Sequence, residues 1–259
     1  MYRMFRWSVA LAAVLLPSIG SAQIEFPKTG YYAALGDSVA AGEGAMPVTR
    51  GYAYQLYDHG VFGTKQQMHF ANLAVRGGRS WDLRDHQVSQ LLCSVSRPTV
   101  VTITAGANDV FRGDLNIPAI VARVVEAVNI LLNNGTPLVP VPVRDPVTGL
   151  PCPRLTNVTI LVSNYYRIPH PVPAIAAQLD AALRGFDQAL SLLLPLVPVS
   201  AGSRVAKVDL YTPSLGREGL VLIERRGGFE GPFDFDVHPT NLGHTFIARQ
   251  FKAAWLALQ

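Results

Sequence analysis

Five short hydrophobic runs recur along the chain. They cover Tyr31–Leu35, Phe70–Ala74, Thr99–Thr104, Val158–Val162 and Val205–Leu210. Most are nearly continuous in apolar residues and rich in β-branched or aromatic side chains, which is typical of strands that are buried on both faces of a parallel sheet. The pattern therefore predicts five buried strands.

Longer segments between and after these runs repeat their apolar residues at helical spacing. The repeats span Ile117–Leu131, which stops before Gly135, then Ile175–Leu190, which Pro195 ends, and finally Ile247–Leu258. Strands that alternate with helices need crossover connections. We expect an α/β fold: a three-layer sandwich with a flavodoxin-like, mostly parallel five-stranded sheet, in one domain.

The first 22 residues have the organisation of a secretory signal peptide. Arg3 and Arg6 form a short basic region, Trp7–Leu16 is apolar, and Gly20–Ala22 supplies small residues for cleavage. The apolar stretch is too short to span a bilayer. We expect cleavage near Ala22, a secreted or periplasmic protein, and a mature domain over residues 23–259.

Composition and charge exclude several classes of protein. The chain is 49% hydrophobic and 15% charged, so it is neither disordered nor a small disulfide scaffold. Loss of the signal peptide removes two arginines and no acidic residue, which lowers the net charge from +4 to +2. No run of Lys or Arg remains to contact phosphates, and we expect no nucleic-acid partner.

The two cysteines, Cys93 and Cys152, both lie in the mature chain. An even pair in an exported protein favours a disulfide over two buried thiols. Neither has a Cys or His neighbour at zinc-ligand spacing. Cys152 belongs to a proline-rich stretch, residues 137–153, that cannot be helix or central strand. We interpret this stretch as an insertion that the disulfide ties down.

Polar clusters follow several of the predicted strands. Asp37 and Ser38 come after the first strand, Gly77 and Gly78 end the cluster after the second, and Asn108 follows the third, while His238 stands just before the last helix. Ligands of open parallel sheets bind beyond the carboxyl ends of the strands. Four such clusters in this order are a stronger signal than any one of them alone.

In these clusters the sequence resembles the SGNH (GDSL) hydrolase family, whose members carry Ser, Gly, Asn and His in four ordered blocks. The resemblance runs from Tyr31 to about His244. It implies a flavodoxin-like fold and ester or thioester hydrolysis through an acyl-serine. The positions that match are Ser38 as nucleophile and His238 as base, with an oxyanion hole of the Ser38 N–H, the Gly77 N–H and the Asn108 amide.

Elementary chemistry agrees with these assignments. A serine hydroxyl needs a neighbouring base, and Ser38 lies where a strand turns into a helix, although an ordinary helix cap would use the same residue. Gly78 is an alternative to Gly77, and Asn108 with Asp109 would also suit a plain turn. His170, which precedes a proline as His238 does, is the alternative base. His59, His69, His86 and His244 are interpreted as structural.

The acidic partner of His238 departs from the family pattern. The family usually places Asp three residues before the histidine, where this chain has Phe235. Asp236 is nearest and is our expected partner, which would fix the imidazole tautomer. Asp234 and a backbone carbonyl remain alternatives.

These features predict a secreted serine esterase or lipase that hydrolyses carboxylic esters of lipid or small acyl type. Alternatives are a carbohydrate O-deacetylase or acyltransferase with the same triad, or a catalytically silent ligand-binding protein. No metal or organic cofactor is implied. We expect a monomer whose partner is a small-molecule or lipid ester, with transient contact to a lipid surface. The segment Gly219–Gly231 is either a lid or an edge hairpin, and rim arginines such as Arg167 are interpreted as solvated surface.

Overall fold

The five hydrophobic runs form one sheet in the computed structural model, which describes residues 30–217, 219–221, 224–225 and 235–259. All four strand pairings are parallel, in the order β2-β1-β3-β4-β5. The predicted α/β class and its flavodoxin-like sheet are confirmed. The strands are β1 Gly30–Gly36, β2 Met68–Asn72, β3 Val100–Thr104, β4 Thr159–Ser163 and β5 Arg204–Val208.

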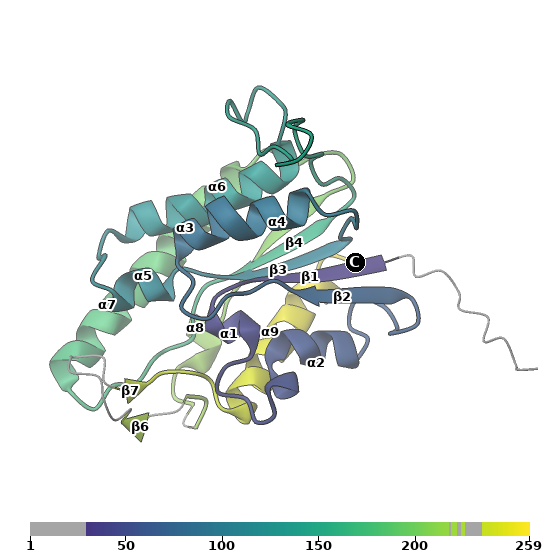
Figure 1. Cartoon of the computed structure of the whole chain (residues 1–259). Helices are drawn as coiled ribbons and strands as arrows, with labels where there is room; N and C mark the ends of the chain where they lie inside the picture. The colour runs from purple at the N-terminus through teal and green to yellow at the C-terminus, as the bar shows by residue number, and fades with distance from the viewer. Residues whose placement is uncertain (1–29, 218, 222–223, 226–234) are drawn as a thin grey trace, which may run out of the picture.

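Helices cover both faces of this sheet (Figure 1). On one side α6 packs against α7 and against the α3–α4 segment, and on the other α2 packs against α9. The helices are α1 Ser38–Ala41, α2 Tyr52–Asp58, α3 Ser80–Asp82, α4 Val88–Leu92, α5 Ala107–Phe111, α6 Ile117–Asn133, α7 Pro173–Leu193, α8 Tyr211–Ser214 and α9 Asn241–Leu256. The short strands β6 Glu224–Arg225 and β7 Phe235–Asp236 pair antiparallel.

Two strands, β2 and β5, end earlier than the hydrophobic pattern predicts, because local side-chain hydrogen bonds turn the backbone. The second strand was predicted to continue to Ala74 but ends at Asn72, whose Oδ1 accepts the Ala74 N–H at 3.1 Å. The fifth was predicted to reach Leu210 but ends at Val208, because Asp209 Oδ1 accepts the Tyr211 N–H at 3.0 Å. Such Asx turns compete with the sheet ladder for the backbone.

The proline-rich stretch, residues 137–153, consists of turns and one isolated bridge between Arg144 and Pro151. Cys152 is joined to Cys93 by a disulfide. Asn134, just after α6, holds the stretch from inside: its Oδ1 accepts the Val143 N–H at 2.7 Å and its Nδ2 donates to the Cys152 carbonyl at 2.6 Å. Cys93 precedes β3 and Cys152 precedes β4, so the bridge lies toward the amino-terminal edge of the sheet, whereas α1 follows the carboxyl end of β1.

Among the residues that the structure describes, no helix combines the length and the apolar character needed to cross a bilayer. The predicted signal peptide, residues 1–22, lies outside the described residues, as does Asp234. Most of the Gly219–Gly231 segment also lies outside them, although its residues Glu224–Arg225 pair with β7.

Replacing both cysteines, as in Cys93→Ser with Cys152→Ser, should lower the free energy of unfolding by about 4 kcal/mol, because the closed loop of 59 residues restricts the unfolded chain. Urea denaturation under oxidising conditions measures this loss. Added reductant should abolish the difference in stability; a difference that persists would contradict the assignment to the disulfide.

Candidate active site

A continuous chain of hydrogen bonds links three side chains that are far apart in sequence. Ser38 Oγ lies 2.8 Å from His238 Nε2, and His238 Nδ1 lies 2.6 Å from Asp236 Oδ1. Ser38 begins α1 directly after β1, whereas Asp236 ends β7 and His238 lies in the loop before α9. The sheet edge and this loop thus bring together the nucleophile and the base that the sequence predicted.

The two-residue spacing between Asp236 and His238 works through an Asx turn. Asp236 Oδ1 accepts the backbone N–H of His238 at 3.0 Å and faces the ring Nδ1 of the same residue. A carboxylate that binds the N–H two residues on is a common local turn. One oxygen therefore fixes both the backbone and the imidazole, which is how an acid at this offset reaches the ring.

This arrangement selects the imidazole tautomer. An ionised carboxylate only accepts hydrogen bonds, so Nδ1 carries the ring proton toward Asp236. Nε2 then presents its lone pair to the Ser38 hydroxyl. The loop is further anchored by Tyr166, whose hydroxyl donates to the Val237 carbonyl at 3.1 Å. The imidazole is oriented to take a proton from Ser38.

Two glycines allow the backbone after Ser38 to turn and to pass close to His238. Gly44 has φ +87°, and a Cβ there would stand 2.3 Å from the Pro239 carbonyl oxygen and 2.8 Å from the His238 Cβ. Only glycine lets the loop after α1 pass this close to the histidine. Gly42 ends α1 in the left-handed region, and the Glu43 N–H then donates to the Ser38 carbonyl at 2.9 Å.

The predicted oxyanion donors lie in loops that are bonded to one another. The Asn108 Nδ2 donates to the Gly78 carbonyl at 3.0 Å, which leaves its second hydrogen available. The N–H of Gly78 is bonded to Val75 at 2.9 Å. Within the described residues, the N–H groups of Ser38 and Gly77 donate to no other group. Of the two candidate glycines, Gly78 thus has its N–H engaged within the protein, whereas Gly77 does not within the described residues.

Asp109, which follows β3, connects its segment to the one that follows β2. It is 2% exposed, and it accepts from the Ser80 N–H and the Ser80 hydroxyl, both at 2.8 Å. Arg123 on α6 adds a contact of 3.2 Å to the same carboxylate. A buried carboxylate needs such partners. This network holds the start of α5, and with it Asn108, against the residues that follow Gly77.

Asp37, beside the nucleophile, is buried and strongly perturbed. It is 1% exposed, its Oδ1 accepts the Val39 N–H at 2.9 Å, and Tyr165 donates its hydroxyl to Oδ2 at 2.5 Å. Burial raises the pKa of Asp37 to about 6, and the hydrogen bonds from Tyr165 and Val39 only partly oppose this. Asp37 therefore caps α1 and titrates near neutral pH.

Glu43 is a site neighbour that the sequence did not indicate. Its Oε2 lies 3.7 Å from His238 Nε2, and Arg76 binds the same carboxylate through Nε at 2.8 Å and Nη2 at 2.5 Å. The available signal was an acidic residue between two glycines, five positions after Ser38. In the sequence alone Glu43 looks like an ordinary acidic loop residue, because nothing there shows that Arg76 and His238 converge on it.

The contacts seen for three other histidines, His244, His170 and His86, are with groups other than Ser38. His244 is fully buried; its Nδ1 accepts the Tyr52 N–H at 3.2 Å, and its Nε2 donates to the Glu43 carbonyl at 2.9 Å. Burial lowers the pKa of His244 to about 4, so it stays neutral and structural. His170, the alternative base, accepts the Val172 N–H at 3.1 Å, and His86 packs edge-on against Trp81.

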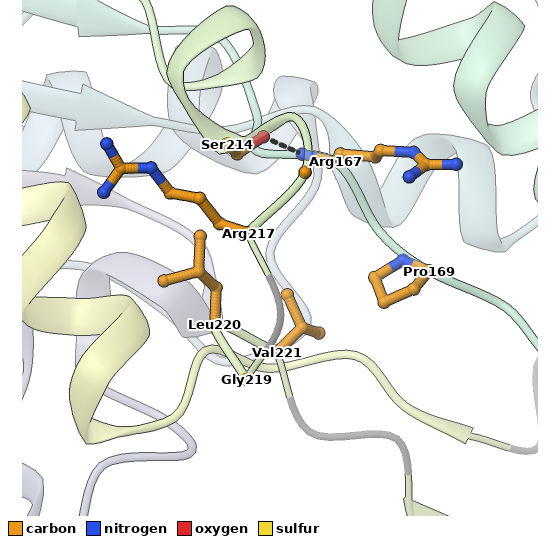
Figure 2. A pocket seen from close by; sticks show the side chains of 8 residues that line it. Arg167, Pro169, Ser214, Arg217, Gly219, Leu220 and Val221 are labelled. Carbon is orange, nitrogen blue, oxygen red and sulfur yellow. Dashed lines mark hydrogen bonds between the residues drawn. The ribbon is translucent and has the colours of Figure 1, made fainter.

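A cavity of about 450 Å³ opens beside the loop that carries His238. In Figure 2, Arg167 and Arg217 reach outward in opposite directions, while Leu220 and Val221 face inward. Arg167 Nε lies 3.7 Å from Asp180, and Arg217 stacks over the Phe246 ring at 5.3 Å. The guanidinium groups of these two arginines thus contact the protein rather than converge on an anion site. Nor do the described residues include a group of three or more His, Cys, Asp or Glu side chains placed to hold a metal ion.

With this geometry established, comparison with known families defines the class of protein. A sequence model of the GDSL-like lipase/acylhydrolase family matches residues 34–246, from the strand before Ser38 into the helix after His238. The chain belongs to this family. No curated protein matches it by sequence.

Several solved structures share the fold. An extracellular lipase from Streptomyces rimosus is 20% identical with a TM-score of 0.53, over 87% of this chain and 99% of that one. A carbohydrate esterase of family 3 from Talaromyces cellulolyticus is 16% identical with a TM-score of 0.56, over 88% and 97%. A salicylyl-acyltransferase of a tetracycline biosynthetic pathway is 16% identical with a TM-score of 0.51; this chain covers 55% of that protein and aligns over 89% of its own length. Sequence identities as low as these show a shared fold and do not by themselves show a shared function.

Asp37 should make stability fall as the pH rises. Its carboxyl binds protons more tightly when folded, with a pKa of about 6 against 3.8 unfolded, so its contribution decreases between about pH 4 and pH 6 and amounts to about 3 kcal/mol. Asp37→Asn should lack this dependence. Its stability relative to wild type, measured by urea denaturation at each pH, should improve by that amount from pH 4 to pH 7.

Tyr165→Phe provides the companion variant. Loss of the hydroxyl that donates to Asp37 raises the cost of ionising the carboxyl further, so the decline should become steeper and extend to higher pH. A stability difference between Asp37→Asn and wild type that does not change with pH would contradict the burial effect.

Proposed function

We propose that this protein is a serine hydrolase that cleaves carboxylic esters through an acyl intermediate on Ser38. The observation that carries the proposal is the hydrogen-bonded chain from Ser38 through His238 to Asp236. Membership of the GDSL-like lipase/acylhydrolase family supports the same chemistry. In this proposal the backbone N–H groups of Ser38 and Gly77 and the Asn108 amide form the oxyanion hole.

The proposed reaction has two halves. Ser38 Oγ attacks the ester carbonyl carbon while its proton passes to His238 Nε2, and Asp236 stabilises the imidazolium. The carbonyl oxygen becomes negative and receives the hydrogen bonds of the oxyanion donors. The imidazolium then protonates the departing alkoxide to release the alcohol. Water, deprotonated by His238, attacks the acyl-serine by the same route and releases the acid.

The nucleophile and base can be tested together with a p-nitrophenyl ester. Ser38→Ala and His238→Ala should each reduce kcat at least about 10³-fold, Asp236→Asn about 10⁴-fold, and Asn108→Ala about 10²- to 10³-fold. A fluorophosphonate probe should label wild type on Ser38 and leave Ser38→Ala unlabelled. His170→Ala is the matched control and should remain active.

Loss of activity in His170→Ala with retention in His238→Ala would overturn the base assignment. A folded wild-type protein that neither hydrolyses esters nor reacts with the probe would favour the alternative of a silent binding protein on this fold.

We infer that the acyl group of the substrate occupies an apolar groove next to Asn108. Gly106 and Ala107, which lead into Asn108, form its near end. The other lining residues come from α5, the segment after β4 and α7: Val110, Phe111, Tyr165, Ile168, Leu179, Ala182, Leu183 and Phe186. An apolar lining favours hydrocarbon over sugar. The free volume is only about 10 Å³, about the space of one water molecule, so an acyl chain would require the aromatic side chains to move, and a longer chain would require more movement.

The groove predicts a preference for short acyl chains. With p-nitrophenyl esters from acetate to palmitate, kcat/KM should be highest for chains of about two to four carbons, because longer chains meet the aromatic side chains that close the groove. Phe111→Ala should move the maximum to longer chains by opening one wall. Leu196→Ala, at an apolar surface between the middle of α6 and the segment that follows α7, is the matched control and should leave the profile unchanged.

The same panel separates the related activities. Wild-type activity that peaks with long chains would exclude this groove as the acyl site. A strong preference for acetylated sugars would favour a carbohydrate O-deacetylase, and transfer to an added alcohol faster than to water would favour an acyltransferase.

We further propose that the protein acts outside the cytoplasm as a monomer, on small or lipid esters. The disulfide between Cys93 and Cys152 suits an oxidising compartment, and the similar Streptomyces rimosus protein is described as extracellular. The predicted signal peptide supports the same location.

A further inference from the structure

The contacts of Glu43 place a second carboxylate beside the proposed base. Its Oε2 lies 3.7 Å from His238 Nε2, the atom that Ser38 Oγ approaches to 2.8 Å. The side chains of Glu43 and His238 are only 15% and 14% exposed. When Nε2 becomes protonated, two acceptors compete for its single proton. A hydrogen bond to Glu43 would hold the imidazolium away from the Ser38 oxygen.

Arg76 opposes this competition. It binds both oxygens of Glu43, at 2.8 Å and 2.5 Å, in the bidentate geometry that guanidinium groups favour. Its own side chain is 73% exposed, so it reaches in from the rim of the site. The paired carboxylate stays beyond hydrogen-bond distance from Nε2 while its charge remains close.

The backbone of Glu43 is also fixed on both sides. Its N–H donates to the Ser38 carbonyl at 2.9 Å, and its carbonyl accepts from His244 Nε2 at 2.9 Å. Because His244 stays neutral, it brings no competing charge to the site. The Glu43 side chain therefore starts from a fixed point in the loop after α1, and the contacts with Arg76 set the position of its carboxylate.

We propose that Glu43 and Arg76 form a positioning pair for His238, in which the carboxylate stabilises the imidazolium electrostatically and the guanidinium keeps it from capturing the Nε2 proton. This inference rests on the proposed function, in which His238 is the base. It adds two residues outside the triad that control when and where the imidazole is charged.

Several titratable groups surround His238, and an experiment must distinguish their ionisation from that of the imidazole. Among the described residues these groups are Asp236 at the end of β7, Asp37 beside Ser38, Glu43 after α1, Arg76 after β2, His244 on α9 and Tyr166 after β4, whose hydroxyl donates to the Val237 carbonyl. Asp37 has a pKa of about 6 and overlaps the range of interest. A pH-rate profile alone would therefore mix two ionisations, so the ring of His238 has to be observed directly.

The first experiment follows the His238 ring by NMR across pH in the full mature chain. Glu43→Gln should move the titration midpoint of the ring to lower pH by about 0.5 to 1 unit, because a nearby negative charge is lost. Arg76→Gln should move it to higher pH by a similar amount, because Glu43 is no longer compensated. Both shifts should shrink in 1 M salt.

The second experiment measures turnover of a p-nitrophenyl ester. Arg76→Gln should lower kcat about 10-fold, since the released carboxylate competes with Ser38 for Nε2. The double variant, Glu43→Gln with Arg76→Gln, should recover most of this activity because the competing charge is gone. A pair that merely supports the fold would give a double variant at least as impaired as Arg76→Gln.

Glu126→Gln is the matched control. It breaks an ion pair of the same kind with Arg84 on the α6 face, where Arg84 Nη1 lies 3.1 Å from Glu126, and it should change neither the midpoint nor kcat. Midpoints that stay in place, or that move in the same direction in both single variants, would overturn the proposal. Because the NMR measurement needs no turnover, that failure is distinct from a lack of ester hydrolysis, which would count against the proposed function itself.

Discussion

The parallel direction of the five strands is the constraint on which this site depends. Because every strand of the sheet runs the same way, the segments that follow β1, β2 and β3 all emerge at one edge. Ser38, Gly77 and Asn108 therefore start close together before any of their own contacts form. Side-chain bridges then fix the segments to one another: Gln87 exchanges hydrogen bonds of 2.7 Å and 2.8 Å with the backbone of Gly36, and Asn72 donates to the Ala40 carbonyl at 2.8 Å.

The second organising feature is the distribution of negative charge around Ser38. Three carboxylates lie in the surroundings of the hydroxyl, and each is accommodated differently. Asp236 faces an imidazole that can become positive, Glu43 is bound by Arg76, and Asp37 is buried against Tyr165 with a pKa of about 6. In the proposed reaction a substrate oxygen becomes negative, and nearby anions would oppose that charge. These separate forms of compensation leave the N–H donors of the site effective.

The proposed function assigns the chemistry and the choice of substrate to different parts of the fold. The hydrogen-bonded chain of Ser38, His238 and Asp236 joins the end of β1 to the loop before α9, whereas the apolar groove lies between α5 and α7. In the proposed function, variation along α7 alters the preferred acyl group without touching His238.

Hydrophobic runs were sufficient to predict the sheet and the long helices, because burial leaves a periodic trace in a sequence. The order of the polar clusters, with the resemblance to the SGNH family, named Ser38, Gly77, Asn108 and His238 as candidates. The short helices α3, α5 and α8 leave no such trace, since they are too short to repeat an apolar stripe. Spacing alone likewise did not decide between Asp236 and Asp234; the carboxylate of Asp236 reaches the ring because it first binds the His238 N–H. Glu43, Arg76 and the partner of Asp37 became visible only in three dimensions. Their roles depend on distances between loops that are 33 and 128 residues apart, and such distances follow from the packing of the whole sheet rather than from any local pattern.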